Sequence, residues 1–118
     1  MFEPNADFAS DLEWMIQSGQ VPRETLLQAL VQEFYPRVYQ LSVLLLDDRQ
    51  AAHKTAQETF ARAIADLHRF RAQEGVENWL FRIALSACEH AKKRLQAHRI
   101  MRSALPFPRK AAIFGDSE

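Results

Sequence analysis

Apolar side chains recur at helical spacing in four stretches of the chain, and short segments rich in polar residues or glycine separate these stretches. The pattern predicts four helices. The first covers residues 7–18, where Asn5 or Asp7 can serve as the N-cap and Gly19 follows the end. Its apolar face consists of Phe8, Leu12, Met15 and Ile16.

A longer apolar stripe predicts a second helix that starts at Pro22, a residue type that suits the first helical position. The stripe advances in steps of three and four residues through Leu27, Leu30, Phe34, Val38, Leu41 and Leu45. It keeps its phase across Pro36, so we expect one helix that is kinked at this proline instead of two helices. An interior proline costs about 3 kcal/mol, which packing must offset.

Asp47 and Asp48 end this run and can cap a third helix from about Arg49 to Phe70. Its apolar line comprises Ala52, Ala56, Phe60, Ala63, Ile64, Leu67 and Phe70. The opposite face comprises Lys54, Gln57, Glu58, Ala61, Arg62, Ala65 and Arg69. Alanines on a polar face let another helix approach closely, although alanine is also the best helix former.

Residues 71–77 have weak periodicity and contain a glycine, so we expect a loop and then an Asn78 cap. The fourth helix is expected from Trp79 to about His98. Its core stripe is Leu80, Ile83, Ala84, Ala87, Ala91 and Leu95, and Phe81, Leu85 and Cys88 widen the apolar surface. A narrow polar strip remains, made of Arg82, Ser86, Glu89 and Lys93. Such a helix packs between neighbours and exposes one strip.

These elements predict an all-α fold with a helical domain at residues 1–98. Residues 99–118 include Pro106 and Pro108 and are predicted to form a linker or irregular tail. At 118 residues the chain fits a single domain. We see no internal repeat and no alternation long enough for a β-sheet.

Charge is distributed unevenly, although the formal net charge is zero. Residues 1–60 carry a net charge of −5 and the remainder +5. Residues 92–110 contain seven lysines and arginines and no acidic residue. This asymmetry is typical of a chain with one end that faces a polyanion, and a solvated helix end with a basic tail is the alternative.

The sequence lacks the residue patterns that disulfides, metal sites and common catalytic motifs require. Cys88 is the only cysteine, so neither an intrachain disulfide nor a cysteine zinc site is expected. The four histidines are isolated, and no phosphate-binding loop or nucleophile elbow occurs. We therefore expect no metal, no cofactor and no enzymatic activity. The N-terminus does not resemble a signal peptide and no apolar run suits a membrane span, so a cytoplasmic protein is expected.

The most distinctive feature is an aromatic and basic cluster around the 71–77 loop. Its members are His68, Arg69, Phe70 and Arg71 before the loop and Asn78, Trp79 and Arg82 after it. Aromatic rings that stack on unpaired bases, beside cations that follow phosphates, are typical of single-stranded nucleic-acid binding. The alternative is that Phe70 and Trp79 pack the two helix ends against the core.

Four blocks in this order resemble region 2 of the extracytoplasmic-function sigma factors of bacterial RNA polymerase. The blocks are Gln57-Glu58-Thr59-Phe60, Leu67-His68-Arg69-Phe70-Arg71, Trp79-Leu80-Phe81-Arg82-Ile83-Ala84 and Lys93-Arg94. The resemblance implies a compact four-helix bundle. It also implies a transcription initiation factor that docks on the clamp helices of the polymerase through the third helix. Promoter −10 DNA would be held as a melted non-template strand, with bases flipped into a pocket at the loop.

The resemblance and the helix faces together give two sets of candidate residues. The polymerase-binding candidates are Lys54, Gln57, Glu58, Ala61 and Arg62. The DNA-binding candidates are Phe70, Arg71, Asn78, Trp79, Arg82, Ser86, Lys93 and Arg94.

The sequence departs from the family pattern at three positions. Lys54 replaces a carboxylate, Ser86 replaces an asparagine, and His90 replaces an acidic residue. These changes motivate an alternative, a diverged interaction module that acts as a decoy or an anti-sigma partner without promoter recognition. The family also carries a second, helix-turn-helix domain, and nothing after Arg94 resembles it. We expect residues 95–118 to begin an interdomain linker, and a stand-alone relative is the alternative.

Overall fold

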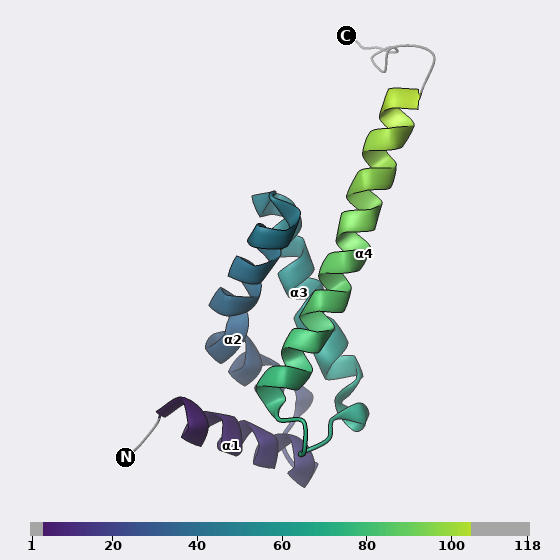
Figure 1. Ribbon diagram of the computed structural model, residues 1–118. Helices are drawn as coiled ribbons and strands as arrows, with labels where there is room; N and C mark the ends of the chain where they lie inside the picture. Colours follow the sequence, from purple (N-terminus) through teal and green to yellow (C-terminus); the bar gives the residue numbers. More distant parts are fainter. Residues whose placement is uncertain (1–3, 105–118) are drawn as a thin grey trace.

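The computed structural model describes residues 4–104, with side chains from residue 11 onward. Throughout this range the regular structure is helical, which confirms the all-α fold class (Figure 1). The elements are α1 (Pro4–Ser18), α2 (Arg23–Leu46), α3 (Arg49–Ala65), the short 3₁₀ helix η1 (Leu67–Arg69) and α4 (Val76–Ala104). Residues 99–104 of the predicted linker or tail, which was expected over 99–118, are helical instead, and the remainder lies outside the described residues.

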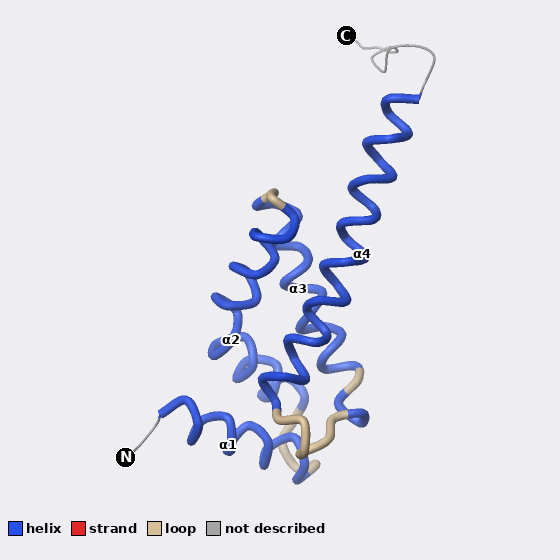
Figure 2. The backbone as a smooth tube through the Cα atoms, in the orientation of Figure 1, coloured by secondary structure: helices blue, strands red, loops and turns tan. Residues whose placement is uncertain are grey.

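Helices α2, α3 and α4 pack side by side, and α1 crosses the end of this group where the loop before α4 lies (Figures 1 and 2). α4 continues to Ala104, six residues past its expected end near His98, and its last turns extend beyond α2 and α3. The loop and the first turns of α4 are therefore held in the bundle, whereas the far end of α4 is exposed.

The core lies among all four helices. Its largest fully buried side chains are Trp79, Phe34, Phe60, Leu12, Leu30 and Leu80. Burying each such side chain contributes about 1.5–3 kcal/mol. The facing sides of α3 and α4 are rich in alanines with 0–3% exposure, which include Ala56, Ala63, Ala84, Ala87 and Ala91. Small side chains let these two helix axes approach closely.

α2 is one helix that runs through Pro36, as expected, while a kink there stays a prediction. Pro22 is the N-cap and precedes the first helical residue, Arg23. The buried side is spaced by four residues and comprises Leu26, Leu30, Phe34, Val38, Ser42 and Leu46. The expected Leu27 and Leu41 are only half-buried and Leu45 is exposed. Residues spaced by four form a row that is inclined to the helix axis, and the buried side of α2 follows this row.

α3 begins as predicted and ends early. The side chain of Asp48 accepts a hydrogen bond from the Ala51 N–H at 2.9 Å, so it is the N-cap. The helix stops at Ala65, five residues before the predicted end at Phe70. The Asp66 N–H is shared between the carbonyls of Arg62 and Ala63, and this tightened turn leads into η1.

Candidate functional site

The start of α4 is built differently from the prediction. The helix begins at Val76, so the predicted Asn78 cap is wrong. Gly75 has a φ of 85°, and its carbonyl accepts the Trp79 N–H at 3.1 Å, which places it at the N-cap. Asn78 lies in the first turn, where its Nδ2 donates to the Glu74 carbonyl at 3.2 Å. The side-chain contact at this helix end comes from Glu13 of α1, whose Oε2 accepts the Val76 N–H at 3.2 Å.

Arg82 holds the loop that precedes α4. Its Nε and Nη2 donate to the two carboxylate oxygens of Glu74 at 2.7 Å and 2.9 Å. These hydrogen bonds, with the charge of Arg82, lower the pKa of Glu74, and Glu74 raises the pKa of Arg82. Arg82 therefore ties the loop to the helix, although 60% of its side chain stays exposed.

The rings of Phe70 and Trp79 lie beneath the surface. They meet edge to face with centroids 5.3 Å apart, and they are 7% and 1% exposed. In this conformation neither ring presents a face on which a base could stack, so the expectation of exposed stacking rings is wrong. Both residues instead pack against the core, which was the alternative, and their contact stabilises the two ends of the loop.

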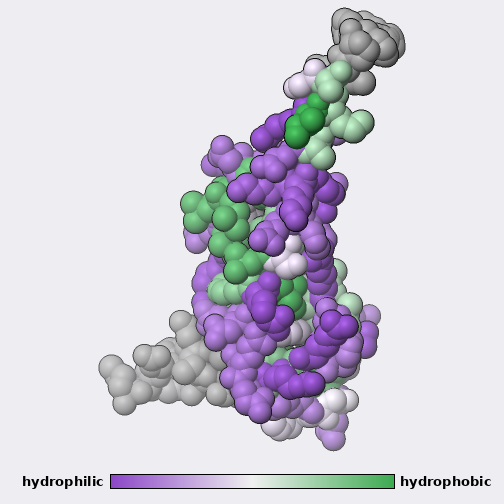
Figure 3. Space-filling model, turned by 45° about the vertical axis from the view of Figure 1, so that its right-hand side comes forward, coloured by the Kyte–Doolittle hydropathy of each residue, from purple (hydrophilic) through white to green (hydrophobic). Residues whose placement is uncertain are grey.

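Exposed polar side chains do form a strip along α4. Asn78, Arg82, Ser86, Glu89 and Lys93 are exposed at intervals of about one helical turn. Arg71 is exposed in the loop at the head of the strip, and its Nη1 donates to the Phe70 carbonyl at 3.4 Å. Figure 3 shows hydrophilic surface over much of the bundle on the face turned to the viewer, with apolar atoms near the end of α4. Near this end of α4, Ile100 and Met101 are 67% and 65% exposed.

The predicted polymerase-binding residues share one face of α3, as their spacing requires. Lys54, Gln57 and Ala61 are exposed, whereas Glu58 and Arg62 are half-buried. Part of this face borders a groove between α3 and α4. The groove is lined by Lys54, Gln57, Glu58 and Ala61 on α3 and by Ala91, Arg94, Leu95 and His98 on α4, among others.

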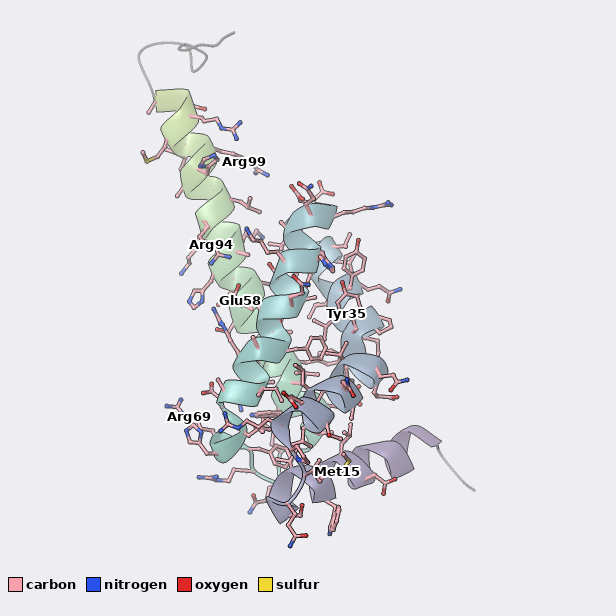
Figure 4. All side chains as sticks on the ribbon, turned by 180° about the vertical axis from the view of Figure 1, so that it is seen from behind. Met15, Tyr35, Glu58, Arg69, Arg94 and Arg99 are labelled. Carbon is pink, nitrogen blue, oxygen red and sulfur yellow. The ribbon has the colours of Figure 1, made fainter. Side chains whose placement is uncertain are left out.

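A charged network connects the two sets of candidates. Glu58 lies 2.7 Å from Arg62 in its own helix and 3.7 Å from Arg94 of α4. Figure 4 shows Glu58 and Arg94 on the neighbouring helices. Arg62 also donates to Nδ1 of His90 at 3.1 Å, which requires the His90 tautomer with its proton on Nε2. His90 thus supplies an acceptor at a position where the resemblance expects a carboxylate.

The family model for sigma-70 region 2 matches residues 30–98, which is more than half of the chain. The chain belongs to the sigma-70 region 2 family. Searches among curated proteins and among solved structures gave no match. Region 2 is a non-enzymatic part of a transcription initiation factor, and it acts in RNA polymerase binding and promoter melting. The resemblance is thereby confirmed at the level of sigma-70 region 2.

Two contacts of this region 2 domain could not be found from its sequence. Arg37 of α2 donates to Glu77 of α4 at 2.6 Å. Glu13 reaches Val76 across 63 residues of sequence. Each contact joins residues that only the tertiary fold brings together, so no local spacing marks them.

The described part of this region 2 domain shows neither a membrane-spanning helix nor a metal-binding cluster. Between residues 4 and 104, none of the helices has the length and hydrophobicity that a membrane span needs. In the same range, no three His, Cys, Asp or Glu side chains gather in a way that could hold a metal ion.

Proposed function

We propose that the chain is region 2 of an extracytoplasmic-function sigma factor. It docks on the clamp helices of bacterial core RNA polymerase through the α3 face and holds promoter −10 DNA as a melted non-template strand. The observation that carries the proposal is the exposed strip on α4, which starts at the anchored loop and ends in cations. A strand that leaves the loop can follow this strip toward Lys93, with Arg94 beside it at the groove between α3 and α4.

Each side chain has a role in this proposal. Arg71, Lys93 and Arg94 bind phosphates, because exposed cations follow the backbone of a single strand. Asn78 and Ser86 offer hydrogen bonds to bases from the same strip. Phe70 and Trp79 contribute by fixing the shape of the loop from beneath.

The docking face also has a physical basis. Ala61 and the neighbouring Gln57 are exposed on α3, and Glu58 lies at the rim of the groove toward α4. A small side chain beside polar groups suits a helix that approaches closely and is oriented by hydrogen bonds at the rim. The clamp helices would lie along this face.

The test measures both interactions of the same protein. We expect the chain to be retained by immobilised core polymerase and to shift single-stranded DNA with an affinity that falls steeply with salt. The double variant Arg71→Ala/Lys93→Ala should lower the magnitude of the logarithmic salt slope by about 1.4, which is about 0.7 for each phosphate contact on a single strand. Arg49→Ala removes an exposed cation at the start of α3, beside Leu44 of α2, and is the control. Absence of both interactions at low salt would rule out the proposal.

A second candidate is a diverged region 2 that binds proteins and has lost promoter recognition. Its support is that Arg82 and Arg94 are engaged with the carboxylates of Glu74 and Glu58. Lys54, in place of a carboxylate, also reverses the charge on the docking face. Binding to polymerase or to an anti-sigma protein without any DNA shift would favour it. If Lys54 weakens docking, Lys54→Asp raises polymerase affinity, and an unchanged or lower affinity contradicts that role.

A further inference from the structure

α1 precedes the residues that match the family model, yet one of its side chains reaches the loop. The match starts at residue 30, whereas α1 ends at Ser18. Glu13 of α1 accepts the N–H of Val76 through Oε2 at 3.2 Å. Val76 is fully buried and is the first residue of α4. The contact therefore lies where the 71–75 loop enters the helix.

Glu13 supplies the hydrogen-bond acceptor that the side chain of an N-cap residue would otherwise provide at the start of α4. Gly75 occupies the N-cap position and has no side chain that could accept a hydrogen bond from the first turn. The side chain of Asn78 does not cap the helix, because its Nδ2 donates to the Glu74 carbonyl. A buried amide needs an acceptor, and a carboxylate at a helix N-terminus also interacts favourably with the helix dipole. Glu13 meets both requirements.

The helix that supplies this carboxylate is itself fixed to the core. Leu12, the preceding residue, is 1% exposed and belongs to the core cluster. Met15 and Ile16 are partly buried and pack against the same cluster. The Glu13 carboxylate is thus delivered by an anchored element, and its position constrains the loop.

We propose that Glu13 is a positioning residue that sets the 71–75 loop for the melted DNA strand. It acts through Val76 and Gly75, at the opposite end of the loop segment from Arg71, while the Glu74 and Arg82 pair supplies a second anchor. This inference rests on the proposed function. Glu13 bonds to the end of α4 that lies away from the α3 docking face, so the proposal separates DNA binding from polymerase binding.

The experiment compares Glu13→Ala and Glu13→Gln with the control Asp11→Ala. Asp11 is exposed on the same helix, so its loss changes the net charge equally. The full chain is bound to core polymerase, and its affinity for single-stranded DNA of random sequence is measured. Glu13→Ala should weaken DNA binding by up to about fivefold, because the bound strand must then order a loop junction that has lost the stabilisation of one helix cap. Polymerase affinity should not change, and Glu13→Gln, whose side-chain oxygen can still accept, should restore most of the DNA affinity.

Exchange of the Val76 amide with solvent provides an independent readout, and it should accelerate in Glu13→Ala but not in Glu13→Gln or Asp11→Ala. If Glu13→Ala loses its helix content, Glu13→Asp decides, because the shorter side chain keeps the charge and withdraws the acceptor. It should then show the selective loss of DNA binding. Wild-type DNA affinity in Glu13→Ala and Glu13→Asp, or an equal loss of polymerase and DNA binding in them, would overturn the inference. Failure of the unaltered chain to bind DNA would instead overturn the proposed function.

Discussion

Glu74 and Arg82 form a two-point ion pair that joins the end of the loop to the exposed strip of α4. Arg82 lowers the pKa of Glu74 below its ordinary value of 4.5, chiefly through these hydrogen bonds. Since the carboxylate is favoured in the folded state, the ion pair stabilises the fold at pH values above the ordinary pKa of Glu74. This stabilisation is lost as the pH falls through the lowered pKa of the folded protein.

Glu74→Gln should therefore be less stable than the unaltered chain at neutral pH, and the difference should shrink as the pH falls through the lowered pKa of Glu74 and vanish once its carboxylate is protonated. Urea unfolding followed by circular dichroism at several pH values measures it. Glu89→Gln, which removes an exposed carboxylate from α4, the helix that carries Arg82, is the control. A stability difference for Glu74→Gln that stayed constant down to acid pH would argue against the pair as its cause.

The two tryptophans offer a matched comparison of core and surface, since Trp79 is 1% exposed and Trp14 is 64% exposed. Trp79→Ala should lower the free energy of unfolding by about 3–5 kcal/mol, because it leaves a cavity beside Phe70. Trp14→Ala should change it by no more than about 0.5 kcal/mol. Chemical denaturation of both variants checks this, and equal losses would contradict the burial of Trp79.

The sequence predicts most of the architecture because periodicity reports which face of a helix is buried. The four helices, the continuity of α2 through Pro36 and the Asp48 cap all follow from local patterns. The early end of α3 does not, because Ile64, Leu67 and Phe70 continue the helical spacing while the chain turns through η1 to deliver Phe70 to the core.

The candidate site was harder to predict, because its side chains depend on tertiary neighbours. The sequence places Arg82 on the exposed strip correctly, yet it cannot show that Glu74 holds this guanidinium. Trp79 looks like a stacking residue until the packing of Phe70 against it is known. No local sequence pattern indicates the contact between Glu13 and Val76, since it joins α1 to α4.

Glu58 links the α3 face to Arg94, so its removal should have opposite effects on the two binding activities. In Glu58→Gln, Arg94 and Arg62 lose a carboxylate partner, and the affinity for single-stranded DNA should rise about two- to fivefold, as expected for an exposed ion pair worth about 0.5–1 kcal/mol. Polymerase affinity should fall because the proposed docking face loses a polar contact. Fluorescence anisotropy and a polymerase pull-down measure the two effects, with the exposed Glu24→Gln as the control. A parallel change in both affinities would speak against the network.

Two glycines allow backbone strain to be separated from the role of the loop. Gly75 has a φ of 85° and Gly19 a φ of 69°, so alanine is strained at either position and should cost about 1–2 kcal/mol of stability. A Cβ on Gly75 would meet Glu13 Oε2 at 3.7 Å, an ordinary contact, and a Cβ on Gly19 would meet nothing within 4 Å. The two substitutions therefore differ mainly in position.

Only Gly75→Ala alters the junction between the loop and α4, and it should weaken binding of single-stranded DNA, whereas Gly19→Ala should lose stability without losing DNA affinity. Thermal unfolding and DNA titration of both variants at a temperature where each is folded test this expectation. Polymerase affinity should stay at the wild-type level in both, because the α3 face is unchanged. If Gly19→Ala weakened DNA binding as much as Gly75→Ala, general destabilisation would account for the effect, and the loop would lose its assigned role.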